Sequence, residues 1–524
     1  MLNQCSRLPQ IIIDKNINTN YASPDCDTGD CACGITNVEA SHLMPCPKTG
    51  QPQEYTTASL QKMADSSPVH RTNFNTIPLN DNYTMCYNTS YNTQAVLNHP
   101  ALDLLSFFNQ PNLLNDIPNK NEINYKTLQQ SIKLGLLIPE NHTPHIMKTM
   151  PETLSTWLHL TDRCNLRCAY CYLPHQNIDM TWQVGKLALE TVFRLAVRHS
   201  YKKVKLKYAG GEAMLRFPFI IKLHQHAKNL AAEHAMALNG IILGNGTILN
   251  ASMLQTIRKM SLQLMISLDG LGKYQDGQRF YASGKGTAND VIQSVMLALQ
   301  HGIVPYISVT VTGQNVAGLP QLMDWLLEHD LPFNLNFYRE HGISSDLTEH
   351  GISSDLSGFG NLTSLADLKL EEETIVNGMT AAFKVIENHM PNRNLLNSLV
   401  DRANLSIPHL RTCNIGQSYF AIDPLGQISK CHTQQHHPIA TIYDDDPLTM
   451  IQADKTGIQN MSVNEKITCQ SCEWKYWCAG GCPIVTYQAS GRYDVSSPNC
   501  RIYKQLYQKA MRLEGLRLLK YANT

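Results

Sequence analysis

Several features are scarce or missing in this sequence of 524 residues. Neither charge is in excess, since Lys plus Arg and Asp plus Glu each number 43, so nucleic acid is not expected as the main partner. Long apolar runs are also missing. The first residues hold a run of three apolar side chains, and the uncharged stretch 235–257 is interrupted by Asn, Gly and Thr. We therefore expect no membrane span and a cytoplasmic location, where thiols stay reduced.

Cysteine, in contrast, is abundant and clustered. The chain has 16 Cys, and seven of them lie between Cys413 and Cys500. In a reducing compartment, clustered cysteines bind metal more often than they form disulfides. The cysteines before residue 72 follow no familiar ligand spacing and are predicted to be free thiols: Cys5, Cys26, Cys31, Cys33 and Cys46. The alternative is a metal site at the cluster CDTGDCAC.

The hydrophobic pattern divides the chain into segments. Residues 1–72 are rich in Asn, Ser, Thr and Pro and are predicted to be a flexible arm. Short strand-like pieces followed by helical ones predict a small α+β module at 73–148. Residues 152–345 alternate six strand-like with five amphipathic segments, which predicts parallel βαβ units in an open sheet or a partial barrel. Ligands of both architectures gather at the carboxyl ends of the strands.

The remaining segments are less regular. A nine-residue tandem repeat, EHGISSDLT then EHGISSDLS, is predicted to be a duplication in a surface loop. We expect the loop repeat and a linker helix at 346–405, a cysteine-rich domain at 406–510 and a C-terminal helix or tail at 511–524.

The first cysteine motif follows the first predicted strand of the βα array. Cys164, Cys168 and Cys171 have the spacing C-x3-C-x2-C. Three thiolates on one loop can hold three irons of a [4Fe–4S] cluster and leave the fourth iron open to a ligand. The alternative is a zinc site with His175 as its fourth ligand.

This motif, together with KYAGGE at the end of the second strand, resembles the radical S-adenosylmethionine (SAM) superfamily. The resemblance implies a partial (β/α)6 TIM-like barrel and a [4Fe–4S] cluster whose open iron is chelated by SAM. In that family, electron transfer cleaves SAM to methionine and a 5′-deoxyadenosyl radical, which abstracts a substrate hydrogen.

The resemblance also implies a set of SAM-binding residues. They are Tyr170, Gly210, Gly211, Glu212, Ser267, Asp269 and Arg279. Tyr170 would lie against the adenine, and Glu212 with nearby strand-end carbonyls would accept from the ammonium group. Ser267 and Arg279 would contact the SAM carboxylate, for which the planar guanidinium is suited. Asp269 would either shape the nearby turn or contact SAM directly, and the NFYR run at 336–339 either faces the pocket or belongs to the core.

The second cysteine group has the order C-x12-G-x4-C, then C-x2-C-x5-C-x3-C, then a final Cys. Two zinc sites would require eight ligands, and this group has seven cysteines. The order instead resembles the signature of SPASM domains, which carry up to two auxiliary [4Fe–4S] clusters. By that resemblance Cys469, Cys472, Cys478 and Cys500 would hold a distal cluster. The cluster nearer SAM would be held by Cys413, Cys431 and Cys482.

The nearer auxiliary cluster lacks a fourth cysteine, because none lies between Cys413 and Cys431. An open iron there would bind a substrate thiolate. Alternatively one of three histidines fills the position: His432, His436 or His437.

The module at 73–148 resembles the winged-helix element that recognises ribosomal precursor peptides, through its strand, strand, VLN and helix order. Such elements bind a leader peptide as an added strand, although a simple packing domain is the alternative. The whole order resembles sactipeptide maturases. We therefore expect a radical SAM enzyme that forms thioether or other crosslinks in a precursor peptide or protein, with flavodoxin or ferredoxin as electron donor. The alternatives are an anaerobic sulfatase-maturing enzyme and an Fe–S scaffold without turnover, and no catalytic acid or base is assigned.

Overall fold

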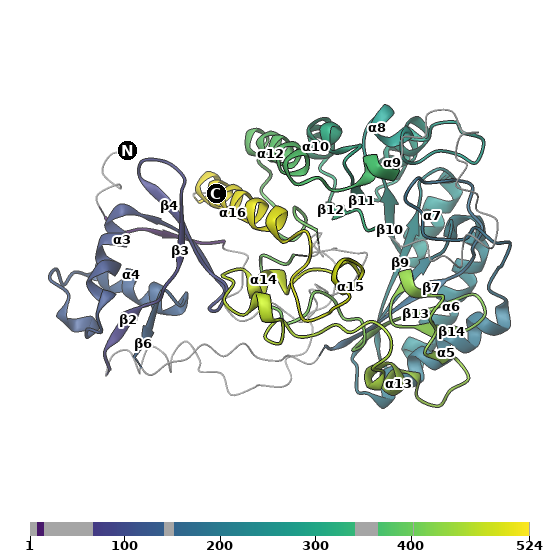
Figure 1. The fold of residues 1–524 in the computed structure, drawn as a ribbon, viewed down its shortest axis with the longest axis horizontal. Coiled ribbons are helices and arrows are strands. Elements are labelled where there is room, and N and C mark those ends of the chain that lie inside the picture. The colour runs from purple at the N-terminus through teal and green to yellow at the C-terminus, as the bar shows by residue number, and fades with distance from the viewer. Residues whose placement is uncertain (1–7, 15–66, 141–150, 341–364, 402, 523–524) are drawn as a thin grey trace.

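The computed structural model describes residues 8–14, 67–140, 151–340, 365–401 and 403–522 (Figure 1). The tandem repeat beyond Glu340 and the five cysteines of the first 72 residues lie outside these ranges. Within the described ranges, no helix is both long enough and apolar enough to span a bilayer.

A nine-stranded sheet forms the centre of the larger part of the molecule. Its strands lie in the order β12-β11-β10-β9-β8-β7-β13-β14-β15. Their bounds are β7 Thr153–His159, β8 Lys203–Ala209, β9 Ala237–Gly244, β10 Gln263–Ser267, β11 Tyr306–Val311, β12 Phe333–Phe337, β13 Tyr419–Ile422, β14 Gln427–Ser429 and β15 Ala440–Thr441. Strands β7 to β12 pair in parallel, which confirms the predicted α/β array. The additional strand β13 pairs in parallel with β7, and β14 and β15 follow in antiparallel register.

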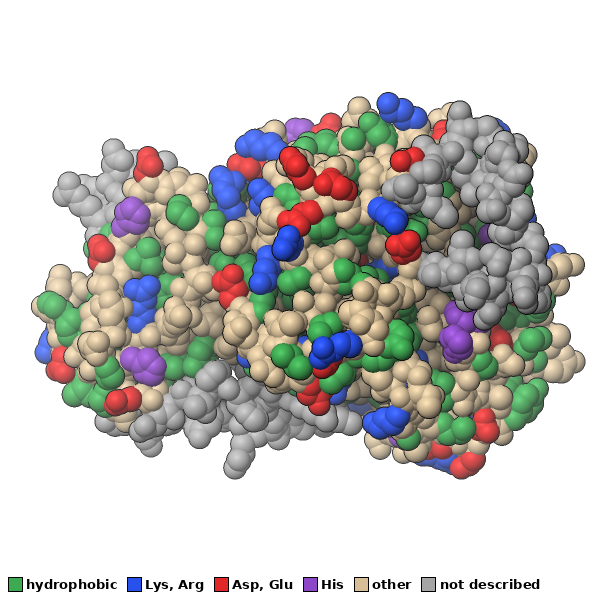
Figure 2. Space-filling model, viewed as in Figure 1, with side chains coloured by type: hydrophobic (Ala, Val, Ile, Leu, Met, Phe, Trp, Pro, Cys, Tyr) green, Lys and Arg blue, Asp and Glu red, His purple; other side chains and the backbone are tan. Residues whose placement is uncertain are grey.

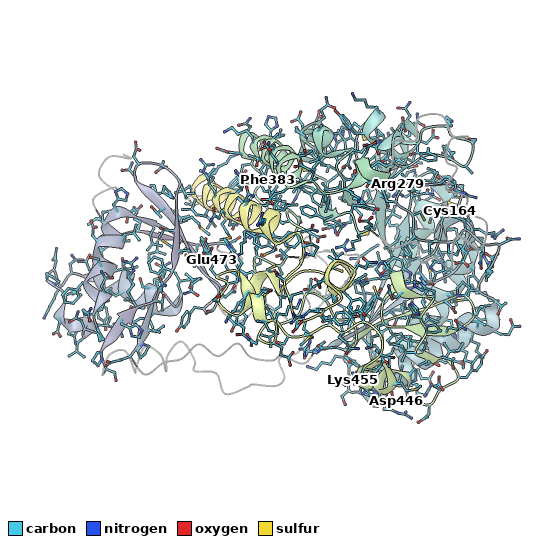
Figure 3. The ribbon with its side chains drawn as sticks, viewed as in Figure 1. Cys164, Arg279, Phe383, Asp446, Lys455 and Glu473 are labelled. Atoms are coloured by element: carbon cyan, nitrogen blue, oxygen red, sulfur yellow. The ribbon has the colours of Figure 1, made fainter. Side chains whose placement is uncertain are left out.

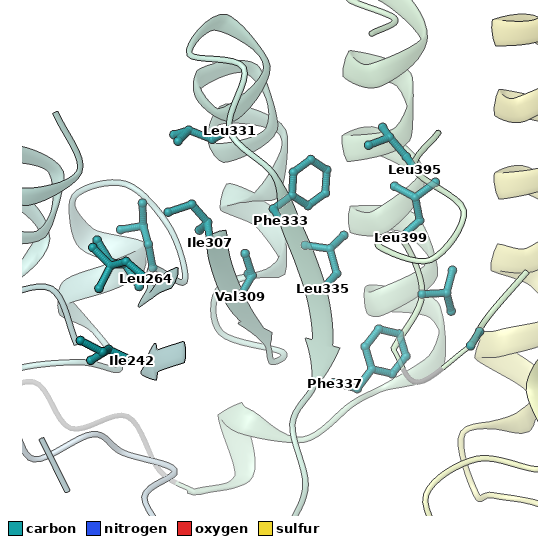
Figure 4. Packing of buried hydrophobic residues seen from close by; sticks show 14 of the residues in the cluster. Ile242, Leu264, Ile307, Val309, Leu331, Phe333, Leu335, Phe337, Leu395 and Leu399 are labelled. Atoms are coloured by element: carbon teal, nitrogen blue, oxygen red, sulfur yellow. The ribbon is translucent and has the colours of Figure 1, made fainter. Parts of the chain in front are cut away.

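Amphipathic helices connect the parallel strands. They are α5 Trp182–Arg198, α6 Phe217–Glu233, α7 Ala251–Met260, α8 Lys273–Asp276, α9 Ala288–Gln300 and α10 Leu319–Glu328. Side chains cap several of them, as where Asn250 accepts from Met253 N at 3.0 Å. Figure 4 shows how apolar side chains fill the space beside β12, where Phe333, Leu335 and Phe337 pack near Leu395 and Leu399. The core thus fixes the strands whose carboxyl ends carry the predicted SAM site.

The N-terminal module has its own small core and two sheets. Their orders are β1-β5-β4-β3 and β2-β6. The elements are β1 Ile11–Ile12, β2 Val69–Arg71, β3 Asn75–Pro78, β4 Tyr83–Asn88, β5 Thr93–Asn98, α3 His99–Ser106, α4 Glu122–Lys133 and β6 Leu137–Pro139. The prediction of a flexible arm over 1–72 is wrong for the described residues, because Ile11 and Ile12 pair with β5 and Val69–Arg71 pairs with β6.

The C-terminal region joins the module to the sheet. It contains α12 Glu372–Asn388, α13 Pro447–Ala453, α14 Lys475–Cys478, α15 Pro483–Ser490 and α16 Cys500–Tyr521. Helix α16 runs without a break across residue 510, where the sequence suggested a boundary. It packs on α12 and across β3, β4 and β5 (Figure 1). A Cβ on Gly515 would lie 2.8 Å from Leu79 and 3.1 Å from Met85, so this glycine permits the close approach.

Candidate functional site: three cysteine groups around one sheet

The first cysteine motif lies on the loop that follows β7. Backbone hydrogen bonds attach this loop to the segment after β10, from Arg167 N to Phe280 O at 2.8 Å and from Ala169 N to Gln278 O at 2.9 Å. Within the loop, Cys171 N donates to Cys168 O at 3.0 Å. The loop is therefore held at the carboxyl ends of the strands, where the sequence predicted it.

The two glycines after β8 pack against the start of the same loop. Gly211 N donates to Thr161 O at 2.7 Å. A Cβ on Gly210 would lie 2.5 Å from Thr161 O, and one on Gly211 would lie 2.5 Å from Arg163 O. Because such contacts leave no room for a side chain, both glycines are needed to seat the loop.

Glu212 is buried and joins the ends of two neighbouring strands. Its Oε1 accepts from Met214 N at 2.8 Å, and its Oε2 accepts from Asn245 N at 2.6 Å, just beyond β9. Burial raises the pKa of this carboxyl to about 7, although the two backbone donors lower it. Each oxygen retains a second lone pair, so the carboxyl could also accept from an ammonium group.

Tyr170, Asp269 and Arg279 form one buried network beside the loop. The Tyr170 hydroxyl donates to Asp269 Oδ2 and accepts from Arg279 Nη1 at 2.6 Å. Asp269 also accepts from Thr310 N at 2.8 Å and from Gln278 Nε2 at 3.1 Å. Asp269 thus ties the ends of β10 and β11 to the cysteine loop.

Arg279 has a hydrogen-bond donor that is not used within the described residues. It lies near Cys164, as Figure 3 shows, and the two groups interact electrostatically. Its Nε is buried and has no hydrogen-bond partner among the described residues. Ser267 ends β10 at a half-buried position. A buried guanidinium with an unpaired N–H fits the carboxylate of SAM, so the residues present agree with the implied cofactor.

The loop thiols need a cationic partner to ionise. Burial raises the pKa of Cys164 to about 11, although the Leu166 N–H, 3.4 Å from its sulfur, lowers it. Burial also raises the pKa of Cys168. A bound metal centre would reverse this by stabilising the thiolates. In the described ranges, no three His, Cys, Asp or Glu side chains converge to hold a single ion. In a cubane cluster each thiolate binds a different iron, so its ligands need not converge on one point.

The four cysteines predicted to hold a distal cluster line a single pocket in the C-terminal domain. These are Cys469, Cys472, Cys478 and Cys500. Trp474, Tyr503 and Tyr507 line the same pocket, so its walls are largely apolar. The structure therefore brings together the four residues that the resemblance to SPASM domains grouped.

The other three cysteines lie in one buried cluster beside β7 and β13. Cys413, Cys431 and Cys482 pack with Trp157 and Tyr419, and all three are at most 5% exposed. Because Trp157 lies on β7 and Tyr419 on β13, this group packs against the strand that leads to Cys164 and against its parallel neighbour.

The histidines considered as ligands are placed differently from one another. The His432 ring stacks on Trp157 at 4.2 Å, and its Nδ1 lies 3.0 Å from the Tyr419 hydroxyl and 4.0 Å from Cys431 Sγ. His436 and His437 contact each other on the surface. For His175, burial lowers the pKa of the ring. Only His432 of these four is buried beside the nearer cysteine group.

A lysine that the sequence analysis missed lies between the two C-terminal cysteine groups. Lys466 is 1% exposed, and its Nζ donates to Ala479 O at 3.1 Å. Burial lowers its pKa, whereas Cys469, Cys478, Cys482 and Cys413 raise it, so it lies near members of both groups. Its position three residues before Cys469 belongs to no spacing pattern, so the sequence alone did not single it out.

Comparison with known proteins agrees with this geometry. Residues 158–326 match the model of the Radical SAM superfamily. A protein of Methanocaldococcus jannaschii is 28% identical over 175 residues, which are 32% of this chain and 57% of that protein. The chain thus spans about half the length of that relative. The radical SAM cyclopropyl synthase TigE of Paramaledivibacter caminithermalis is 20% identical over 482 residues, which are 84% of this chain and 95% of that one.

A solved structure shows the same fold. The structure of anSMEcpe with bound AdoMet and Cp18Cys peptide superposes with a TM-score of 0.55 at 16% identity, covering 71% of this chain and 99% of that one. The matched residues 158–326 include the cysteine loop and the Tyr170, Asp269 and Arg279 network. The chain therefore contains a radical SAM domain over residues 158–326.

Proposed function

We propose that this enzyme uses SAM and three [4Fe–4S] clusters to modify a peptide or protein by forming a crosslink, such as a thioether. The observation that carries the proposal is the position of His432, the residue after Cys431. Its ring stacks on Trp157 of β7 at 4.2 Å and lies 6.1 Å from the ring of Tyr172, the residue after Cys171. These contacts place the buried group around Cys431 next to the loop that carries Cys164, Cys168 and Cys171. A substrate held there would lie between the SAM site and an auxiliary metal centre.

At the SAM site the chain's own residues would bind and orient the cofactor. Cys164, Cys168 and Cys171 would hold the cluster, and the unpaired Nε–H of Arg279 would bind the SAM carboxylate. Tyr170, held by Asp269, would lie against the adenine. When bound, SAM supplies a 5′-deoxyadenosyl radical that abstracts hydrogen from the substrate.

The two auxiliary groups would serve electron removal and substrate binding. The distal pocket offers four cysteines, enough for a closed cluster. The nearer group offers three, and the Nδ1 of buried His432 is engaged by the Tyr419 hydroxyl. A position left open beside Cys431 would suit a substrate thiolate. Lys466, between the groups, would favour the reduced state of either cluster.

The N-terminal module would recognise the substrate. It contacts the segment between Cys472 and Cys478, since Tyr87 stacks on Trp474 at 4.8 Å and Thr89 Oγ1 donates to Glu473 O at 2.7 Å. Glu473 is labelled in Figure 3. A leader peptide bound to its sheet would therefore lie next to the auxiliary domain. The face in Figure 2 carries interspersed basic and acidic side chains, which fits a peptide better than a polyanion.

Formylglycine formation is the second candidate, because the fold is shared with anSMEcpe along 99% of that chain. That likeness concerns the fold and suits either reaction. The match leaves part of this chain uncovered, since it extends over 71% of it, and the additional segments favour a substrate that is recognised through a separate module.

Co-expression with candidate peptides tests the proposal. The chain is produced with short peptides encoded in neighbouring reading frames, and the peptides are analysed by mass spectrometry. A crosslink removes two hydrogens from the peptide, and tandem fragmentation locates the bond. The second candidate would be favoured by two results together: the peptides keep their mass, and the cysteine or serine of an adjacent sulfatase is converted to formylglycine.

A further inference from the structure

The strand-pairing edge of β5 in the N-terminal module is occupied by the chain's own N-terminal segment, residues 8–14. Ile11 pairs with Leu97 and Ile12 with Val96 in antiparallel register. A peptide that adds a strand to a sheet edge makes this type of contact.

The segment is held by a side chain as well as by the sheet. Asn98 Nδ2 donates to Leu8 O at 2.6 Å, and Asn98 Oδ1 accepts from Gln10 N at 2.9 Å. Asn98 N also donates to Gln10 O at 3.3 Å. Tyr83 adds a contact to a side chain, since its hydroxyl donates to Gln10 Oε1 at 2.8 Å. The side-chain amide of Asn98 thus binds the backbone of residues 8–10 whatever their side chains are. Tyr83, in contrast, selects a side chain at position 10 that can accept a hydrogen bond.

The next three residues are isoleucines that face two different cores. Ile11 and Ile13 pack against the core of the module. Ile12 packs against the main core, which includes residues of α16. Because alternate residues of a strand point to opposite faces, the segment is wedged between the module and the C-terminal helix. An occupant of this position must therefore be apolar on both faces.

An ion pair closes the end of the segment. Asp14 bonds to Arg517 of α16, and both side chains are at most 7% exposed. Arg517 also bonds to Glu514 at 2.6 Å and to Asn392 O at 2.7 Å. Because Glu514 remains when Asp14 leaves, the guanidinium stays in place as a receptor for another carboxylate.

We propose that residues 8–14 are an intramolecular ligand of the peptide-docking edge, and that a peptide in extended form competes for it. The competing peptide carries a hydrogen-bond acceptor side chain, three aliphatic residues and then an acidic residue, as in QIIID. The identity of that competitor as the enzyme's substrate rests on the proposed function. Occupancy of the edge by this chain's own segment does not.

A binding experiment tests the inference with a defined probe. The probe is a fluorescent synthetic peptide with the sequence of residues 6–15, SRLPQIIIDK. Binding is measured by fluorescence anisotropy on the cluster-loaded full chain, on a chain lacking residues 1–14, and on a Gln10→Pro chain, which loses the N–H that Asn98 accepts. Leu8→Ala is the control, because this side chain is 44% exposed and the residue contributes its carbonyl.

We expect the truncated and Gln10→Pro chains to bind the probe at least about tenfold more tightly than the full chain and the Leu8→Ala chain, because the edge is free in the first two. A probe with Asp14→Arg should bind more weakly to the truncated chain. Equal binding to all four chains, or no binding to the truncated and Gln10→Pro chains, would overturn the proposal and leave residues 8–14 as a structural strand. SAM cleavage without peptide is measured in parallel, so that failure of the proposed function is recognised separately.

Discussion

Arg279 donates a 2.6 Å hydrogen bond to the hydroxyl of Tyr170, the aromatic residue between the second and third cysteines of the loop. The guanidinium is buried, and its Nε is unpaired within the described ranges. This hydrogen bond couples the position of the ring that we propose to stack on adenine to the cation that we propose to bind the SAM carboxylate.

Arg279→Lys should weaken SAM binding by about 10–100-fold, because charge-assisted hydrogen bonds of this kind contribute about 1.5–3 kcal/mol. A lysine lacks the planar set of N–H donors with which a guanidinium binds a carboxylate. SAM affinity is measured by equilibrium dialysis on cluster-loaded protein. Arg198→Lys, at a surface ion pair, is the matched control. An unchanged affinity with a full iron content would remove Arg279 from the SAM site.

Asp269→Asn should lower the stability of the fold. The carboxylate accepts from Tyr170, Gln278 and the Thr310 N–H, and an amide nitrogen in place of one oxygen would face a donor. An unsatisfied buried group costs about 1–3 kcal/mol, so the midpoint of thermal unfolding should fall clearly below that of Ser267→Ala. Equal midpoints for the two variants would contradict a structural role for Asp269.

Iron content should follow the three cysteine groups. The reconstituted chain is expected to hold about 12 Fe, and replacing Cys164, Cys168 and Cys171 together with Ala should leave about 8. Cys478→Ala should remove up to about 4 Fe from the distal pocket, whereas Cys86→Ala, a buried free thiol of the module, should remove none. Zinc in place of iron around Cys469–Cys482 would refute the auxiliary clusters.

Lys466→Met should lower the reduction potentials of the auxiliary clusters by tens of millivolts, because a buried cation near both groups favours the added electron. Potentials are read from redox titration followed by electron paramagnetic resonance. Lys455→Met, an exposed lysine of the same domain labelled in Figure 3, is the control. Identical potentials in both variants would mean that the charge of Lys466 is compensated elsewhere.

The regular α/β array could be read from the sequence because each strand and helix carries its own hydrophobic period. The three loop cysteines could be grouped because their spacing is local, and the seven C-terminal cysteines could be grouped because their order resembles a known signature. Sequence could not give the pairing of β13 with β7, since that contact joins residues far apart in the chain. The two-residue strand β1 is too short to show a period, and Asn98 and Arg517 hold it from distant positions. The burial of Lys466 could not be predicted either, because nothing in the neighbouring sequence distinguishes it from an exposed lysine.

We propose, above all, that this chain cleaves SAM to generate a radical. The most direct measurement is release of 5′-deoxyadenosine by the reconstituted, reduced enzyme, quantified by chromatography and compared with the Cys164→Ala, Cys168→Ala, Cys171→Ala triple variant. The native chain should release 5′-deoxyadenosine, and the triple variant should release none. No 5′-deoxyadenosine from a native chain that holds all three clusters would contradict the proposal.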